Sequence, residues 1–266
     1  WWINKDENSL REILCTRTNE QIQDMQAAWF SGTPQGRNRA AELYGDKYRD
    51  ENKYPSEWFR TNGIVQGKTM REYVLNKYTK SGRFTGHGNE RQLYEKLFDA
   101  NRPANGPVNQ QQVKQDAEAL NRTLKQDKKH EAKSKFIEIF TARSWTHIAA
   151  MSGMFQDISK KWTLQGAMKH TFGSSDTGAA LAIIEEFATQ PYDYWAKKLR
   201  AAMKGMGTDD EAMRRVIISR AEIDLRDIGI VFGQRYGDGK TLNKWIKDDL
   251  GGDYEKLALA VCGLDD

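Results

Sequence analysis

Apolar residues recur every three or four positions along most of the chain, which is the spacing of amphipathic α-helices. In the segment 108–125, for example, the apolar side chains fall on one helical face: Val113, Ala117, Leu120 and Leu124. Alternating apolar runs joined by a tight turn, which would predict a β-hairpin, are not found in the sequence. The pattern therefore predicts an all-α protein.

One apolar helical segment that ends in arginine occurs three times. The three copies end at Arg17, Arg143 and Arg220. Such self-similarity predicts an array of related helical units. At a helix end, an arginine can bond the last carbonyl groups and interact favourably with the helix dipole, so we expect these three to serve the structure.

Turn residues divide the remaining helical patterns. Residues 6–31 are predicted to form two helices, with a break at 17–20 and Thr18 as N-cap of the second, 20–30. Further helices are predicted at 89–100, 108–125, 144–162, 164–170, 176–187 and 192–203. The clearest linker is 101–107, which contains two prolines and a glycine. Pro191 is expected to end one helix, with Tyr192 or Asp193 capping the next.

Composition excludes several classes of protein. The 266 residues include 38% hydrophobic and 29% charged residues, and the net charge is +4. No apolar run reaches eighteen residues, so no membrane-spanning helix is expected. The positive charge is spread over helices without a dense aromatic and basic motif, and nucleic-acid binding is not expected. The two cysteines, Cys15 and Cys262, sit in apolar helical patterns and are predicted to be buried free thiols, which fits a reducing compartment.

Catalytic and nucleotide-binding motifs are missing. The four histidines are scattered, and no nucleophile has an adjacent base, so the chain is not expected to be an enzyme. The tripeptide Gly-Lys-Thr occurs at 67–69 and 239–241. A phosphate-binding loop needs a glycine five residues earlier, where the chain has Asn62 and Gln234. We therefore reject a nucleotide site.

A glycine loop offers a different chemistry. Residues 203–210, Met-Lys-Gly-Met-Gly-Thr-Asp-Asp, place Gly205 and Gly207 between two helical patterns. A hard cation such as Ca²⁺ takes six to eight oxygen ligands, and glycine exposes its backbone carbonyl without a shielding Cβ. The loop alone leaves the ion short of ligands and of negative charge. A carboxylate from elsewhere in the chain would supply both, and Asp249 is the candidate.

Residues 193–266 closely resemble the last repeat of an annexin, from DYWAKKLRAAMKGMGTDD through RRVIISRAEIDL to GGDYEKLALAVCGLDD. The resemblance implies repeats of five helices and a calcium site made of the carbonyls of Met203, Gly205 and Gly207 with both oxygens of Asp249. Asp249 is preferred to Asp248 because the family's acid lies three residues before the glycine that matches Gly252.

The resemblance also implies further roles near this loop. Thr208 and Asp210 are candidates for a weaker neighbouring ion site, and Lys204 for contact with lipid. After the loop, Thr208 is predicted to be the N-cap of the next helix, with Glu211 completing a capping box.

Three repeats are recognisable. Residues 1–107 form a degenerate repeat that lacks its first helix and has an insertion at about 31–66, or a join across absent residues. Residues 108–191 form a repeat without a complete calcium site, and 192–266 a repeat with one. We expect the sequence to be part of something longer. The insertion is either a surface elaboration or a loop that contacts a partner or membrane through Trp58 and Phe59.

Basic residues replace the glycine loop in the earlier repeats. The segment 125–131 has no glycine, and no acid falls near 170–172, where the carboxylate is expected. Lys5, Lys125, Lys128 and Lys129 are candidates for direct attraction to anionic lipid, with ordinary solvated loops as the alternative.

Two functions remain. The first is calcium-dependent, peripheral binding to anionic phospholipid membranes by a cytoplasmic protein, with Ca²⁺ bridging loop oxygens to lipid phosphate. The alternative is a calcium-independent structural adaptor between membrane and cytoskeleton, with a cytoskeletal protein as partner, which would use the annexin scaffold, the insertion and the basic patches.

Overall fold

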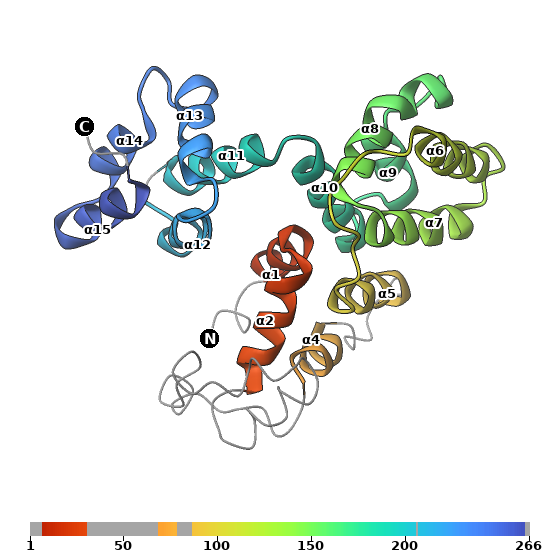
Figure 1. Ribbon diagram of the computed structural model, residues 1–266, viewed down its shortest axis with the longest axis horizontal. Coiled ribbons are helices and arrows are strands. Elements are labelled where there is room, and N and C mark those ends of the chain that lie inside the picture. Colours follow the sequence, from red (N-terminus) through yellow and green to blue (C-terminus); the bar gives the residue numbers. More distant parts are fainter. Residues whose placement is uncertain (1–6, 31–68, 79–86, 206, 264–266) are drawn as a thin grey trace. The chain divides into compact units, whose positions relative to one another are not determined.

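A computed structural model of the chain describes residues 7–30, 69–78, 87–205 and 207–263. These ranges contain fourteen α-helices and no strand, so the all-α prediction is confirmed (Figure 1). The predicted insertion at 31–66, with Trp58 and Phe59, lies outside the described residues, as does Lys5. No helix in the described ranges is long and apolar enough to span a membrane.

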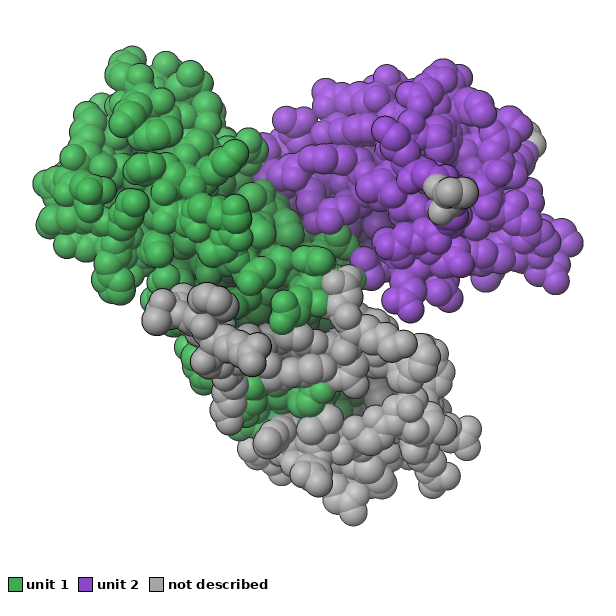
Figure 2. All heavy atoms as spheres, turned by 180° about the vertical axis from the view of Figure 1, so that it is seen from behind, with its two compact units in different colours: residues 1–185 green, residues 186–266 purple. Residues whose placement is uncertain are grey.

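The chain divides into two units, residues 1–185 and 186–266 (Figure 2). The helices of the first unit are α1 (Glu7–Thr16), α2 (Asn19–Phe30), α4 (Met70–Tyr78), α5 (His87–Phe98), α6 (Gln110–Lys125), α7 (Lys129–Ala142), α8 (Trp145–Ser159) and α9 (Leu164–Phe172). Helix α10 (Asp176–Thr189) carries the boundary. The second unit continues with α11 (Pro191–Met203), α12 (Asp210–Arg220), α13 (Leu225–Arg235), α14 (Leu242–Asp249) and α15 (Gly252–Cys262).

Threonine residues are the N-caps of several of these helices. Thr18 accepts a hydrogen bond from the Gln21 N–H at 3.2 Å, which confirms it as the predicted cap. Both Gly-Lys-Thr tripeptides end in a cap as well, because the Thr69 and Thr241 hydroxyls accept from backbone N–H groups three residues on. These threonines therefore satisfy the free N–H groups of a helix start, as N-caps do.

The expected boundary at Pro191 is confirmed, because α10 ends at Thr189 and α11 begins at Pro191. The expectation that Tyr192 or Asp193 caps the next helix is wrong. Pro191 is the first residue of α11, and Gln190 is the N-cap. Proline is well tolerated at this position, because its missing N–H would have no partner in the first turn and its φ already suits a helix. Pro191 therefore follows the end of α10 and is itself the first residue of α11.

Aromatic side chains fill the helical core of the first unit. Phe136 of α7 is fully buried and meets Phe140 and Phe172 edge-on, with ring centroids 5.9 and 5.7 Å apart. Val113, Ala117 and Leu120 of α6 are fully buried, as the apolar pattern predicted. Both cysteines are buried free thiols, also as predicted. Burial raises the pKa of Cys15 to about 12 and that of Cys262 to about 11.

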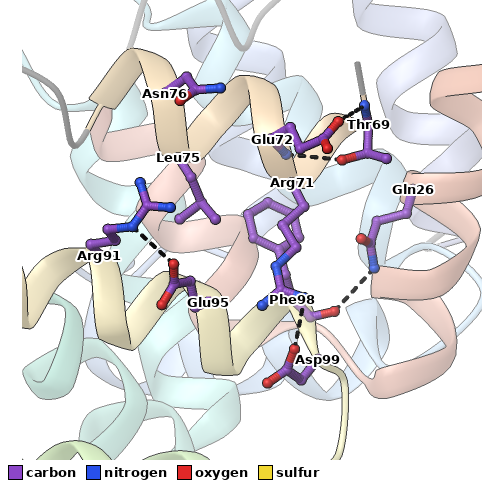
Figure 3. A pocket seen from close by; sticks show the side chains of 10 residues that line it. All are labelled: Gln26, Thr69, Arg71, Glu72, Leu75, Asn76, Arg91, Glu95, Phe98 and Asp99. Carbon is purple, nitrogen blue, oxygen red and sulfur yellow. Dashed lines mark hydrogen bonds and ion pairs between the residues drawn. The ribbon is translucent and has the colours of Figure 1, made fainter. Parts of the chain in front are cut away.

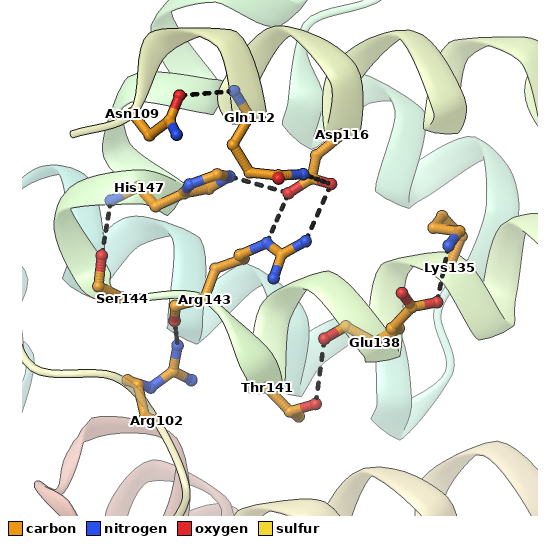
Figure 4. A network of polar contacts seen from close by, with 10 residues as sticks. All are labelled: Arg102, Asn109, Gln112, Asp116, Lys135, Glu138, Thr141, Arg143, Ser144 and His147. Atoms are coloured by element: carbon orange, nitrogen blue, oxygen red, sulfur yellow. Dashed lines mark hydrogen bonds and ion pairs between the residues drawn. The ribbon is translucent and has the colours of Figure 1, made fainter.

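Two of the three helix-end arginines pair with carboxylates, and this corrects the expectation that they bond carbonyl groups. The third, Arg17, donates a hydrogen bond to the Thr16 hydroxyl at 3.5 Å. Arg143 donates two hydrogen bonds to Asp116 of α6, at 2.6 and 3.2 Å (Figure 4). Arg220 likewise donates to both oxygens of Asp224. The carbonyls at the end of α7 are satisfied by Arg102 of the linker, which reaches those of Phe140 and Arg143 at 2.6 and 2.5 Å.

Asp116 is the centre of the polar network in Figure 4. Its oxygens also accept from Gln112 at 3.1 Å and lie 3.0 Å from His147 Nε2. Burial alone would raise the pKa of Asp116, but the hydrogen bonds and charge of Arg143 outweigh burial and lower it. The network therefore ties α6 to the end of α7 and the start of α8.

Asp116→Asn is expected to lower the free energy of unfolding of the first unit by about 1–3 kcal/mol at neutral pH, because Arg143 loses its partner. The wild-type pKa is lower in the folded than in the unfolded chain, so this stability is present above the unfolded value of about 3.9 and is lost as pH falls through the folded pKa. The difference in free energy of unfolding between the wild type and the Asp116→Asn variant should therefore become smaller in acid.

Hydrogen exchange of peptides from α6, α7 and α8 at several pH values measures this difference. Glu118→Gln is the matched control, because Glu118 is exposed on the same helix and lies 3.8 Å from Lys114. Equal exchange in wild type and the Asp116 variant at neutral pH would show that the network contributes no stability.

Candidate metal centre

The loop between α11 and α12 has a closed, glycine-dependent conformation. The Asp209 N–H donates to the Ala202 carbonyl at 2.8 Å and joins the two ends of the loop. Gly205 and Gly207 have φ values of +129° and +97°, a backbone region that L side chains rarely adopt. A Cβ at either position would meet no atom within 4 Å, so the requirement for glycine is conformational and the loop surface is open.

Backbone carbonyls at this loop are candidate ligands. Met203 is the last residue of α11, and the last four carbonyls of an α-helix have no partner within the helix. The Ala202 carbonyl is occupied by Asp209. A helix C-terminus also carries partial negative charge, which favours a cation. The side chain of Met203 is buried, while Lys204, Gly205 and Gly207 are exposed.

The structure brings Asp249 to the loop. Asp249 is the last residue of α14, and its Oδ2 accepts a hydrogen bond from Thr208 Oγ1 at 2.5 Å. The neighbouring Asp248 is engaged elsewhere, with Lys240 Nζ at 2.8 Å and Lys244 Nζ at 2.7 Å. Hydrogen bonds from these two lysines lower the pKa of Asp248. The two adjacent carboxylates therefore have different environments, and Asp249 is the one beside the glycine loop.

The predicted capping box at Thr208 is wrong. The N-cap of α12 is Asp209, whose Oδ1 accepts from the Ala212 N–H at 3.0 Å. Threonine and aspartate are both favoured N-caps, with aspartate the better of the two, so the local sequence Thr-Asp-Asp also allowed Asp209. The choice is decided by a residue 41 positions away, because the Thr208 hydroxyl is bonded to Asp249.

The proposed secondary ion position contains one exposed acid. Asp210 is the first residue of α12, and its side chain is exposed. The nearby Tyr254 of α15 has a buried hydroxyl that makes no hydrogen bond within the described structure. Burial, and then the negative charge of Asp210, raise the pKa of Tyr254, against the opposing charge of Arg214. Asp210 therefore contributes negative charge next to the loop, while the Thr208 hydroxyl points to Asp249.

The α6–α7 connection has a different chemistry. It contains no glycine, and Asp127 takes the positive φ of +52°. Lys125, Lys128 and Lys129 are exposed, and Lys128 Nζ lies 3.2 Å from Glu131 Oε1. At the end of α9, Thr171 is buried and its hydroxyl donates to the Ala167 carbonyl. This connection therefore carries exposed lysines where the α11–α12 loop carries exposed glycines.

Side-chain clusters do not offer a second metal centre in the described ranges. No group of three or more His, Cys, Asp or Glu side chains there is arranged to hold a metal. A calcium centre built from carbonyls and one carboxylate does not need such a group, because oxygen ligands of any kind suit this ion. The donor set at the α11–α12 loop therefore fits calcium and does not fit a soft metal.

A cavity of about 620 Å³ lies in the first unit (Figure 3). It is lined by side chains of α2, α4 and α5. Its arginines are in ion pairs, with Arg71 3.0 Å from Asp99 and Arg91 2.9 Å from Glu95. Because these charges neutralise one another, the cavity does not present a set of groups for one class of ligand.

Known proteins with similar sequences and structures share this architecture. A family model described as Annexin matches residues 194–261. Mouse (Mus musculus) annexin A4 is 41% identical over 132 residues, which is 50% of this chain and 40% of that protein. Bovine (Bos taurus) annexin A5 is 30% identical over 263 residues, which is 98% of this chain and 67% of that protein. The solved structure of annexin III has a TM-score of 0.71 and 27% identity, and the match covers 98% of this chain and 66% of that one.

The match to mouse annexin A4 thus covers about two-fifths of that protein, and the match to bovine annexin A5 covers about two-thirds of that one. The family model falls on α11–α15, the helices that carry the glycine loop and Asp249.

Proposed function

The chain belongs to the annexin family, and from this premise we propose that it binds anionic phospholipid membranes in a calcium-dependent way through the α11–α12 loop. The carbonyls of Met203, Gly205 and Gly207 and the carboxylate of Asp249 would hold the ion. Calcium, when bound, would offer its remaining coordination positions to phosphate oxygens of the lipid. Lys204, exposed beside the loop, would add attraction to the anionic surface.

One observation carries this proposal. The hydrogen bond between Thr208 and Asp249 holds a carboxylate against a loop of backbone carbonyls that is 41 residues away in sequence. A carboxylate is the only charged ligand in this set, so its position decides whether the loop can neutralise a divalent cation. Asp249 is half-buried at the end of α14, and releasing Thr208 would free its second oxygen without moving the helix.

The donor set also indicates the strength of binding. With one carboxylate, the affinity for calcium in solution is expected to be weak, about 10⁻⁴ to 10⁻³ M. Anionic lipid would strengthen it, because calcium and lipid each complete the other's site, and coupled binding is reciprocal. Thr208 and Asp210 form the proposed weaker second position. Lys128 and Lys129 on the α6–α7 connection are proposed to add calcium-independent attraction to the same lipids.

Vesicle sedimentation tests the function. The 266-residue chain is mixed with vesicles of phosphatidylserine and phosphatidylcholine at about 1 mM calcium, which matches the expected affinity, and again with a chelator. We expect the chain to pellet with calcium, to remain in solution with chelator, and to remain in solution with phosphatidylcholine vesicles in both conditions. Equal pelleting with and without chelator would overturn the proposal and, if salt abolished it, favour the calcium-independent adaptor.

A further inference from the structure

Asp249 has a single partner among the described residues, and that partner is an uncharged hydroxyl. Its Oδ2 accepts a hydrogen bond from Thr208 Oγ1 at 2.5 Å, and neither of its oxygens takes part in another hydrogen bond or ion pair with the described part of the chain. The adjacent Asp248 instead pairs with the ammonium groups of Lys240 and Lys244. The carboxylate beside the glycine loop is therefore bonded to a donor that does not neutralise its charge.

The position of Asp249 is set by the packing of α14. Ile246, one turn earlier on this helix, is fully buried. The Trp245 indole donates a hydrogen bond to the Gly237 carbonyl, which follows α13, at 2.8 Å. The Arg200 guanidinium of α11 lies 4.0 Å from the centroid of the same indole. These contacts fix α14 on α11 and α13, so Asp249 stays beside the loop whether or not its hydrogen bond is made.

The glycine loop is likewise closed by bonds that do not involve the Thr208 hydroxyl. The Asp209 N–H donates to the Ala202 carbonyl at 2.8 Å, and Asp209 Oδ1 caps α12 by accepting from the Ala212 N–H at 3.0 Å. Thr208 precedes this N-cap and is not the cap itself. The hydroxyl is therefore required neither to close the loop nor to begin α12.

A calcium ion and this hydroxyl need the same oxygen atom. The proposed site uses both carboxylate oxygens of Asp249, whereas the hydrogen bond from Thr208 occupies Oδ2. A hydrogen bond to an ionised group is one of the stronger kinds in proteins, and it has to be released before the ion can take both oxygens. In the calcium-free protein the same bond satisfies a half-buried carboxylate. The bond therefore stabilises the calcium-free state.

We propose that the Thr208 hydroxyl competes with calcium for Asp249 and thereby sets the calcium concentration at which the loop fills. The inference rests on the proposed function, because it concerns the regulation of the same site. Asp249 alternates between two states, one bonded to the hydroxyl and one holding the ion with both oxygens. Whatever stabilises the first state alone lowers the apparent affinity for calcium. Thr208 thus determines affinity without being a ligand of this ion.

Thr208→Val tests the competition, because valine has nearly the shape of threonine and is branched at Cβ in the same way, but has no hydroxyl donor. Sedimentation with phosphatidylserine vesicles is measured as a function of free calcium. The calcium concentration of half-maximal pelleting is expected to fall about 10-fold in the variant, from the loss of one hydrogen bond to a charged group. If the hydroxyl only held Asp249 in place, this concentration would rise instead.

Thr208→Ser is the matched control, because serine keeps the hydroxyl and loses only a methyl group. This variant should require the same calcium concentration as the wild type. Thr208→Ala also lacks the donor and should shift the calcium requirement in the same direction as valine. Circular dichroism in chelator should show the same helix content for all three variants, because none of them removes a helix cap.

Hydrogen exchange gives a second readout that does not depend on membranes. In chelator, peptides from the start of α12 and the end of α14 should exchange faster in Thr208→Val than in the wild type, because the bond between these segments is lost. At saturating calcium the two proteins should exchange alike, because the ion has released the bond in both. Equal exchange in chelator would overturn the inference, because the bond would then contribute nothing to the calcium-free state.

The calcium titration separates this inference from the proposed function. A calcium requirement that is unchanged or higher in Thr208→Val, while Asp249→Asn still weakens calcium binding, would overturn the competition and leave the calcium site standing. A wild-type chain that does not pellet with phosphatidylserine vesicles in a calcium-dependent way would overturn both.

Discussion

Asp249→Asn is expected to lower the affinity of the chain for calcium by at least about 100-fold, because it removes the only charged ligand of the proposed set. Asparagine keeps the size of the side chain and one carbonyl oxygen, and it can still accept the hydrogen bond from Thr208. Helix content should therefore be unchanged. Isothermal titration calorimetry with calcium in the presence of phosphatidylserine vesicles measures the loss.

The adjacent acid provides an unusually close control. Asp248→Asn removes the same charge one residue away, on the same helix, but Asp248 is exposed and pairs with Lys240 and Lys244. Exposed ion pairs contribute little to stability, so neither stability nor calcium affinity should change much. If both variants lost calcium binding equally, the effect would be one of net charge. If neither did, Asp249 would not be a ligand.

Trp195→Ala is expected to destabilise the second unit by about 3–5 kcal/mol, which is the largest effect on stability that we foresee. Trp195 is fully buried on α11, the helix that leads into the glycine loop. It meets Phe187 and Tyr194 edge-on, and the Arg220 guanidinium lies 5.5 Å from its ring centroid. Alanine would leave a cavity among these groups.

Hydrogen exchange in peptides from α11 and α12 measures this effect directly. Tyr192→Ala is the control, because Tyr192 is an aromatic residue of the same helix that is 41% exposed, and its truncation should cost less than about 0.5 kcal/mol. The Trp195→Ala variant should lose calcium affinity only in proportion to the fraction of its second unit that is unfolded. Unchanged exchange in that variant would show that the core does not depend on Trp195.

The helices could be predicted from the sequence because each carries a continuous apolar face. The segment 108–125 predicted α6 to within two residues, and Thr18 capped α2 as expected. These features depend on residues within a few positions of one another. The fold class followed from the same local signals, since the repeated helices have no competing strand pattern.

Contacts between residues that are far apart in the sequence could not be predicted in the same way. The linker residue Arg102 lies in a stretch that looked like a simple connection, yet its guanidinium bonds two carbonyls of α7 and stacks 3.9 Å from the Trp145 ring centroid. Thr208 looked like a cap because nothing nearby shows that Asp249 takes its hydroxyl. Local propensity cannot decide such choices, because the competing partner is far away in sequence.

The candidate site was partly predictable for the same reason. Gly205 and Gly207 stood out because glycine exposes its backbone carbonyl without a shielding Cβ, and the structure adds that both have positive φ. The choice of Asp249 over its neighbour came from resemblance to a family, and the contact with Thr208 supplies a physical reason for it. Their roles as ligands stay a prediction.

The most direct test is a crystal structure of the chain grown with calcium. The account predicts an ion at the α11–α12 loop, with oxygens of Met203, Gly205, Gly207 and Asp249 at about 2.3–2.6 Å and the Thr208 hydroxyl released from the carboxylate. An ion bound elsewhere, or Asp249 still bonded to Thr208 in a calcium-saturated crystal, would contradict it.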